Sequence, residues 1–414
     1  MAGARQKRAA QADPDPTPEP TRRTSAVMAP PAWLQSHWGG VPDPEAESAC
    51  RVGVLEVSRS GGKSAATRLF HQYPLRLIVP RRVKSAFPDA DCIWCYSVTF
   101  GGGLVAGDRS GMSVSVADGC AAVLATQGTT KVYKHARGVS VAPRTDHSND
   151  AITDEASRYS AGDAKTSRDT VQALAARVGA GSLLAVLPDP VQSFRDSRFR
   201  NRQRIELAPT ASLALVDWVV AGRAGFEGGG AGGFTSGYGG GIAPAETFPR
   251  DPSGERWVFQ SYATATEVSV DGREVLMESL RLDQTWAGPG GLAGRMGATH
   301  ALAVVVLIGP RCATAVARLK DVVEPVAKST VAGAAVGVSE RPDPAGHAGW
   351  LLASFSDLKV GGGGDKVPGD KESPGVVARV AGPDTDSVYA VLRAALEPLG
   401  VELGAAPFAE RGLA

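Results

Sequence analysis

Short apolar runs separated by Gly, Pro and Asp dominate the chain between residues 51 and 309. In the segment 112–116, Met-Ser-Val-Ser-Val alternates apolar and small polar residues with a period of two, which is typical of a strand with one buried face. Similar runs follow throughout this region, with hardly any helical periodicity between them. This density of short strands predicts an all-β-dominated fold of stacked antiparallel or β-helix-like layers.

Two segments have helical periodicity instead. Apolar residues recur every three or four positions in 316–326 and again in 388–396, which predicts two amphipathic helices, one of them near the C-terminus. Asp384 and Thr385 precede the second helix as candidate caps. We expect both helices to cover an edge or an end of the sheets.

Three polar or glycine-rich stretches interrupt the strands, near 141–169, 224–254 and 361–374, and their composition is typical of flexible insertions. Residues 1–48 are rich in Ala, Pro and charge and show little periodicity, so we expect a disordered N-terminal tail. The remainder, 49–414, is predicted to be a single β domain that carries these insertions.

Charge and cysteine content narrow the class of protein. The 414 residues include 44 Lys and Arg against 43 Asp and Glu, a formal net charge of +1. No overall field favours nucleic acid or an anionic membrane, and no run approaches the roughly 18 consecutive apolar residues of a membrane span. Five Cys, an odd number, and an N-terminus without the features of a signal peptide favour reduced thiols and a cytoplasmic location.

Catalytic signatures are weak. The glycine-rich segment 101–116 loosely fits a dinucleotide fingerprint, but the residues after the glycines alternate like a strand where a helix should begin. The six His show no metal-binding spacing, and there is no nucleophile elbow or catalytic Cys signature. The sequence therefore favours a protein that is not an enzyme. An alternative is an independent β-rich enzyme acting on a small molecule, with Asp108 and Arg109 at the glycine-rich turn as its site.

Five segments carry a family resemblance, and they occur in this order: GGGLVAGDR (101–109), ATQGTTKVYK (125–134), LPDPVQSFRDSRFRNRQRIEL (187–207), DWVVAGR (217–223) and ESLRLD (278–283). Together they resemble the urease accessory protein D family, over about residues 50–400. The resemblance implies a compact, mostly β fold with two helices and a role without catalysis, as a scaffold or conduit. It also implies partners, namely apo-urease, accessory protein F and, through F, the GTPase G that carries nickel. A further alternative is a metal-free interaction module that only holds urease open.

The resemblance implies that Ni²⁺ is held only in transit, with no permanently bound cofactor. Oxygen ligands suit this task, because isolated carboxylates release Ni²⁺ more readily than a Cys or multi-His cage. Three acids in the matching segments are candidates for a nickel path: Asp108, Glu206 and Glu278. The alternative for each is a turn, a cross-strand ion pair with a nearby Arg, or a buried hydrogen bond.

Candidate partner-binding residues lie in the same segments. A polar edge follows the apolar run CAAVLA, and a basic run with an aromatic residue covers 198–204, a combination favoured at protein interfaces. The alternative is a solvated sheet face. The candidates are Gly101, Gly102, Gly103, Gly107, Arg109, Thr126, Gln127, Thr130, Lys131, Tyr133, Asp189, Pro190, Arg198, Phe199 and Arg204.

Overall fold

The computed structural model describes residues 52–80, 87, 89–134, 169–223, 255–331, 351–360 and 374–409. The N-terminal tail predicted over 1–48, and all but the last residue of the insertions predicted near 141–169 and 361–374, lie outside this part of the chain, as does the insertion near 224–254.

Strands make up most of the described chain. They are β1 (Gly53–Ser60), β2 (Lys63–His71), β3 (Leu75–Ile78), β4 (Ile93–Thr99), β5 (Arg109–Val116), β6 (Ala121–Thr126), β7 (Thr130–Val132), β8 (Thr170–Val178), β9 (Leu183–Leu187), β10 (Val191–Ser193), β11 (Arg198–Leu207), β12 (Ser212–Val220), β13 (Ser261–Val270), β14 (Arg273–Asp283), β15 (Ala301–Ile308), β16 (Leu352–Asp357) and β17 (Gly375–Gly382). The helices are α3 (Gly291–Met296), α4 (Ala313–Val331), α5 (Thr385–Leu396) and α6 (Gly400–Leu403), with short 3-10 turns η1 (Phe100–Gly102), η3 (Gln284–Trp286), η4 (Pro310–Cys312) and η5 (Glu397–Leu399).

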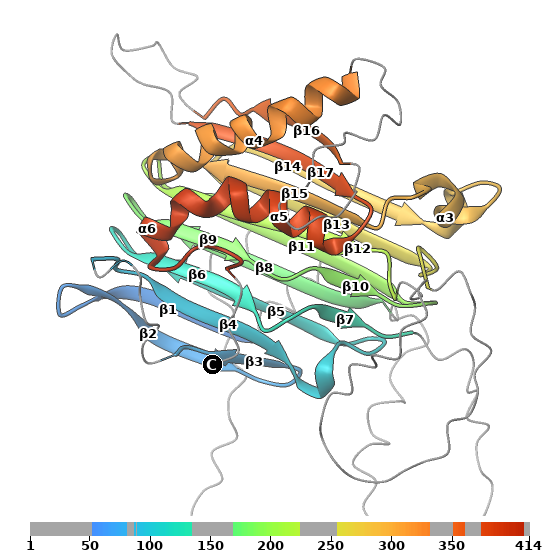
Figure 1. Cartoon of the computed structure of the whole chain (residues 1–414). Helices are drawn as coiled ribbons and strands as arrows, with labels where there is room; N and C mark the ends of the chain where they lie inside the picture. The colour runs from blue at the N-terminus through green and yellow to red at the C-terminus, as the bar shows by residue number, and fades with distance from the viewer. Residues whose placement is uncertain are drawn as a thin grey trace, which may run out of the picture.

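The strands form two sheets (Figure 1). The seven-stranded sheet has the order β14-β13-β11-β8-β5-β1-β2. The ten-stranded sheet follows the path β16-β17-β15-β12-β9-β6-β4-β3, and β10 joins it by pairing with β12 and β7. The predicted β-dominated class is confirmed.

The middle of each sheet is parallel. β1, β5, β8, β11 and β13 are parallel neighbours in the seven-stranded sheet, and β4, β6, β9 and β12 are parallel neighbours in the ten-stranded sheet. The chain alternates between the sheets as it adds these strands, so it coils around the space between them. Antiparallel pairs occur at the margins, for example β1 with β2 and β13 with β14. The β-helix-like alternative therefore describes the middle of the fold, and antiparallel layering describes only its margins.

An apolar core fills one end of the space between the sheets. On the inner face of the seven-stranded sheet, one row of paired and buried residues consists of Leu55, Val114, Ala176, Ile205 and Val268. The facing strands contribute similar side chains, among them Leu124, Val186, Leu215 and Val306. Burying each of the larger side chains stabilises the fold by about 1.5–3 kcal/mol, so this row fixes how the sheets face each other.

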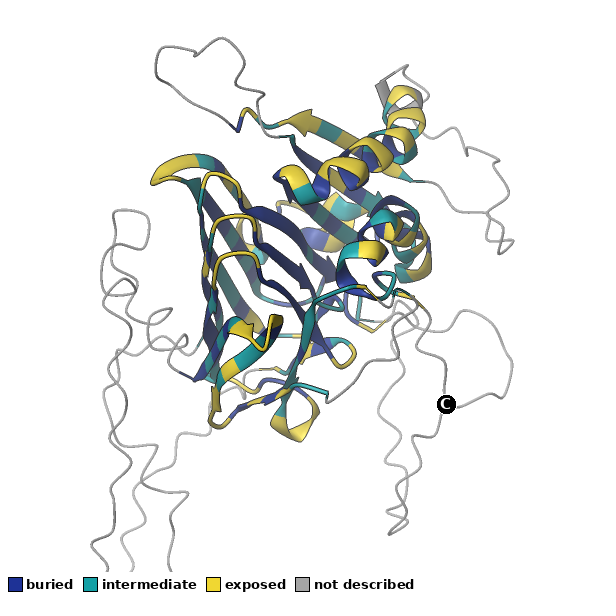
Figure 2. Ribbon diagram, turned by 90° about the vertical axis from the view of Figure 1, so that its left-hand side faces the viewer, coloured by how far each residue is buried: buried dark blue, intermediate teal, exposed yellow. Residues whose placement is uncertain are grey.

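The two predicted helices are confirmed as α4 and α5. Val316, Leu319 and Val323 of α4 are buried against the outer face of the ten-stranded sheet, together with the apolar face of α5. The carboxylate of Asp384 accepts a hydrogen bond from the backbone N–H of Ser387 at 2.7 Å and caps α5, as predicted. Both helices cover a sheet face rather than an edge or an end, and Figure 2 shows their exposed residues on the side away from the strands. No helix among the described residues is long and apolar enough to cross a membrane.

Candidate functional site

The inner face of the seven-stranded sheet changes from apolar to polar beside the core. Two rows of paired residues cross it there. The first row consists of Ser110, Gln172, Asn201 and Thr264. In the second row, Gln203 of β11 pairs with Thr266 of β13, and Thr266 pairs with Glu278 of β14 at the edge of the sheet. We call the polar residues of these two rows, with those that face them, the polar stripe.

The ten-stranded sheet contributes the facing side of the polar stripe. Ser97 of β4 pairs with Thr126 of β6. Further across, Asp217 of β12 pairs with Val304 of β15, which in turn pairs with Arg379 of β17. The polar stripe thus runs through the interior from β4 and β5 to the margin formed by β14 and β17.

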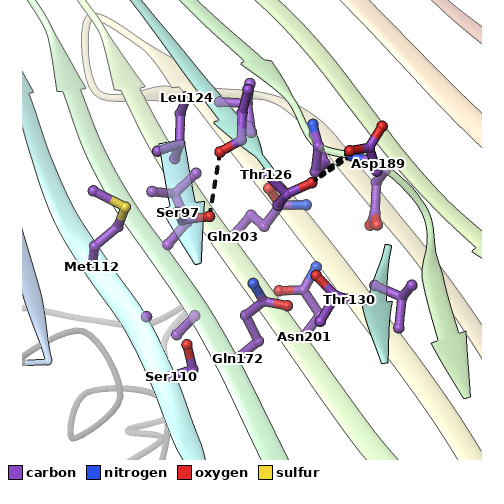
Figure 3. A pocket seen from close by; sticks show the side chains of 18 of the residues that line it. Ser97, Ser110, Met112, Leu124, Thr126, Thr130, Gln172, Asp189, Asn201 and Gln203 are labelled. Carbon is purple, nitrogen blue, oxygen red and sulfur yellow. Dashed lines mark hydrogen bonds between the residues drawn. The ribbon is translucent and has the colours of Figure 1, made fainter. Parts of the chain in front are cut away.

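A cavity of about 70 Å³ opens within the polar stripe (Figure 3). One water molecule needs about 10–15 Å³ in this measure, so the cavity has room for several. Apolar side chains such as Met112 and Leu124 form part of the wall. The polar part of the wall consists of Ser97, Ser110, Thr126, Thr130, Gln172, Asp189, Asn201, Gln203 and Asp217.

Asp217 is the acid at the centre of this arrangement. Its carboxylate accepts hydrogen bonds from the Thr264 hydroxyl and the Gln203 amide of the opposite sheet. Burial raises the pKa of the Asp217 carboxyl above its usual range, the two hydrogen bonds oppose this rise, and the charge of Glu278 adds to it. A carboxyl in such a place exchanges its proton at a higher pH than a surface aspartate does.

Burial raises the pKa of the Tyr262 hydroxyl well above its usual range, and the charge of Asp217 adds to this rise. This hydroxyl is fully buried and finds no hydrogen-bond partner within the described part of the chain. Buried hydroxyl groups are normally satisfied by a protein group, a water molecule or an ion. Tyr262 therefore adds a second buried polar group to the neighbourhood of Asp217.

Asp189 lies between the cavity and a second hollow, which is on the outer side of the ten-stranded sheet. It borders both spaces, and the outer one has a volume of about 440 Å³. One carboxylate oxygen accepts a hydrogen bond from the Tyr389 hydroxyl at 2.7 Å, and the other accepts one from the Gly128 N–H at 2.8 Å. The aromatic rings of Trp94, Tyr96 and Tyr389 line the outer hollow. Asp189 therefore lies between the interior cavity and the outer hollow beneath α5.

The three acids predicted for a nickel path lie in three different settings. Glu278 belongs to the polar stripe. Glu206 lies on the opposite, outer face of β11, because its neighbours Ile205 and Leu207 point into the core. There it forms the cross-strand ion pair that the alternative interpretation predicted, with Arg177 at 2.9 Å. Asp108 is outside the cavity wall, in a turn before β5.

Asp108 closes that turn. Its Oδ2 accepts a hydrogen bond from the Val105 N–H at 2.9 Å, its own N–H donates to the Val105 carbonyl at 3.0 Å, and Gly107 supplies a φ of 83° between them. Burial raises the pKa of the Asp108 carboxyl, and the hydrogen bond from Val105 opposes the rise. This geometry matches the turn that the alternative interpretation predicted.

Replacing Asp108 with alanine is expected to lower the free energy of unfolding by about 1 kcal/mol, the usual cost of losing a capping side chain. Binding of Ni²⁺ by the chain should stay unchanged, because this carboxylate does not line the cavity. Thermal unfolding and equilibrium dialysis with Ni²⁺ measure the two quantities. Asp108→Asn, which keeps an acceptor oxygen, is the matched control, and a normal melting temperature with weaker Ni²⁺ binding would contradict the turn role.

Two of the matching segments meet in space. The Leu104 N–H donates to the Lys131 carbonyl and the Tyr133 N–H donates to the Leu104 carbonyl, each at 2.8 Å. A Cβ atom at Gly103 would lie 2.5 Å from the Tyr133 ring and 2.7 Å from the Lys131 carbonyl oxygen, so only glycine fits. The glycine-rich segment is therefore a packing element against β7.

The candidate partner-binding residues divide by burial. Gly101, Gly102, Gln127, Lys131 and Arg198 are exposed, whereas Gly107, Arg109, Tyr133, Asp189 and Arg204 are half-buried. The buried ones are Gly103, Thr126, Thr130, Pro190 and Phe199. The predicted polar edge is therefore in part the cavity wall, since Thr126 and Thr130 line it. Phe199 is a core residue, because strand alternation turns the odd-numbered residues of β11 inward.

The sequence patterns did not predict Asp217 and Arg379 as site residues. The signal for Asp217 was present: it is the lone acid in the apolar run LALVDWVV. A carboxylate is rarely placed in a buried strand without a partner or a function. Arg379 gave no comparable signal, since Glu278 lies 101 positions away along the chain.

The polar stripe can supply separate oxygen donors to a cation. Asp217 and Glu278 offer carboxylates, and Thr264 and Gln203 add a hydroxyl and an amide group beside Asp217. Within the residues that the structure describes, no three His, Cys, Asp or Glu side chains form a group that could hold a metal ion.

Comparison with known proteins gives consistent matches over most of the chain. Residues 51–231 and 246–411 match the family model described as UreD urease accessory protein. Urease accessory protein D of Oryza sativa subsp. japonica is 31% identical over 372 residues, which cover 88% of this chain and 96% of the rice protein. Urease accessory protein UreD of Anaeromyxobacter sp. (strain Fw109-5) is 32% identical over 370 residues, 89% of this chain and 92% of the bacterial one. Urease accessory protein D of Arabidopsis thaliana is 28% identical over 360 residues, 86% and 99% of the two chains.

Proposed function

This chain belongs to the urease accessory protein D family, and from that premise we propose that it is a non-catalytic cytoplasmic scaffold and conduit. It binds apo-urease and accessory protein F, and it passes Ni²⁺, delivered by the GTPase G through F, toward the urease active site. Nickel is its cargo, and it needs no permanently bound cofactor. One observation carries the proposal, the buried carboxylate of Asp217 in a polar stripe that crosses the apolar interior.

The energetics of the polar stripe support this role. Burying polar groups costs free energy unless they are hydrogen-bonded, and burying a carboxylate costs more. An apolar row like the neighbouring one, which lies two residues along each strand and contains Val114 and Ile205, would stabilise the same sheets better. Interior positions that depart from the stable choice are typical of functional sites.

The chemistry of the polar stripe suits transfer rather than storage. One carboxylate with hydroxyl and amide neighbours binds Ni²⁺ more weakly than a cluster of imidazoles or thiolates. Because the pKa of the Asp217 carboxyl is raised, metal binding competes with a proton there, so the affinity for Ni²⁺ should fall as the pH is lowered. Both effects favour release to the next site.

The test is rescue of urease in a strain that lacks its own D protein, with this chain and its cognate accessory proteins supplied. We expect active, nickel-loaded urease and co-elution of the chain with accessory protein F on size exclusion. Failure to rescue with all partners expressed would refute the accessory role for this chain. Rescue without measurable Ni²⁺ binding in equilibrium dialysis would instead identify a metal-free module that only holds urease open.

A further inference from the structure

An ion pair closes the polar stripe at the margin of the two sheets. Glu278 on β14 and Arg379 on β17 come from opposite sheets. The guanidinium holds both carboxylate oxygens, with Nε 2.9 Å from Oε1 and Nη2 in contact with Oε2. Such a bidentate pair is among the strongest charge-assisted contacts in proteins. The side chains are 16% and 46% exposed, so the carboxylate faces the interior more than the guanidinium does.

Glu278 is the acid next to Asp217 along the polar stripe. The residue paired with Glu278 is Thr266, which pairs with Gln203, a hydrogen-bond donor to Asp217. The charge of Glu278 also contributes to the raised pKa of the Asp217 carboxyl, so the two carboxylates interact. A cation that moves outward from Asp217 meets Glu278 as its next charged oxygen donor, and Arg379 already occupies that donor.

We propose that Arg379 is a counter-ion that a divalent cation displaces from Glu278, and that it thereby keeps the affinity of the conduit for Ni²⁺ low enough for transfer. This inference rests on the proposed function and names a positioning residue for it. A dication attracts a carboxylate more strongly than a guanidinium does, because it carries twice the charge in a smaller volume. A monovalent cation lacks this advantage, so the ion pair also favours Ni²⁺ over Na⁺ and K⁺.

A merely structural ion pair would behave differently. Pairs with a partly exposed partner contribute about 0–1 kcal/mol to stability, and their loss generally leaves ligand binding unchanged or weaker. A displaced counter-ion has the opposite signature, since its removal frees Glu278 and makes the site bind a cation more tightly. The direction of the change in Ni²⁺ affinity therefore separates the two roles.

The experiment is equilibrium dialysis of Ni²⁺ with the full-length chain, in complex with accessory protein F where the complex is needed for solubility. Arg379→Gln is expected to lower the Kd for Ni²⁺ by about tenfold, which corresponds to 1.4 kcal/mol. Arg379→Lys, which keeps the charge but loses the two-pronged contact, should lie between Arg379→Gln and the wild type. The double variant Arg379→Gln, Glu278→Gln should lose the gain. Arg177→Gln is the matched control, because its partner Glu206 lies on the outer face of the sheet, and it should bind Ni²⁺ like the wild type.

An unchanged or higher Kd in Arg379→Gln would overturn this inference, and so would a gain that persists without Glu278. If Arg379→Gln does not fold, a wild-type Kd in Arg379→Lys decides against it. The proposed function is tested separately by Asp217→Asn in the rescue assay. Normal urease activation by Asp217→Asn would refute the conduit, whereas loss of activation there with wild-type Ni²⁺ binding by Arg379→Gln would refute only the role of Arg379.

Discussion

Asp217→Asn is expected to reduce nickel per urease active site by roughly tenfold or more in the rescue assay. Mutating a residue that merely supports a metal ligand already lowers metal affinity by about 10–100-fold, and Asp217 is proposed to contact the metal itself. Asparagine has nearly the same shape and keeps an oxygen that can accept the hydrogen bond from Thr264. It lacks the negative charge that would attract Ni²⁺ into the cavity. Nickel analysis of purified urease and its specific activity measure the effect. Glu206→Gln, a charge removal on the outer face, is the control and should activate urease normally.

The same substitution should not destabilise the fold at neutral pH. Because the folded-state pKa of the Asp217 carboxyl is raised, the folded chain holds this proton more tightly than the unfolded chain does. The free energy of unfolding therefore falls as the pH rises from the unfolded pKa through the folded pKa. Above the folded-state pKa the ionised carboxylate destabilises the fold, so Asp217→Asn should melt there at the same or a higher temperature, and the difference should disappear at low pH. A lower melting temperature together with loss of activation would make Asp217 a structural residue.

Strand content and the two helices could be predicted from the sequence because they depend on local periodicity. The period-two alternation of 112–116 became part of β5, and the helical spacing of 316–326 and 388–396 became α4 and α5. The parallel coil could not be predicted in the same way. β11 pairs with β8 and β13 and not with its sequence neighbours β10 and β12, and no local pattern encodes such a partner.

The site was harder to predict, because strand alternation assigns a side chain to a face only where polar and apolar residues alternate. Glu206 lies between Ile205 and Leu207, so alternation alone places it on the face away from the core. Asp217 lies in a run that is apolar at nearly every position, because β12 is covered by the other sheet on one face and by helices on the other. Alternation cannot assign a face in such a strand. The pairing of Glu278 with Arg379 depends on how two sheets meet, which requires the structure.

Phe199→Ala is expected to lower the free energy of unfolding by about 3–5 kcal/mol, the usual cost of truncating a buried aromatic side chain. Phe199 is fully buried in the cluster at the end of the polar stripe, and its ring centroid lies 5.5 Å from that of Tyr262, in a stacked arrangement. Thermal or denaturant unfolding measures this loss. Arg198→Ala is the matched control, because Arg198 precedes Phe199 on β11 and is exposed, and a surface change of this kind stays within about 0.5 kcal/mol.

The outcome for Phe199 also decides what the basic run 198–204 does. If Phe199 is a core residue, accessory protein F and urease should bind the folded fraction of Phe199→Ala as tightly as they bind the wild type, because the side chain does not reach the surface. Any interface on β11 must then use the exposed Arg198 or its half-buried neighbours, such as Arg204. Co-elution with accessory protein F at a temperature where both variants are folded compares them directly. Weaker binding by Phe199→Ala with an unchanged melting temperature would contradict the burial of its ring, whereas weaker binding by Arg198→Ala alone would place the partner surface on the outer face of β11.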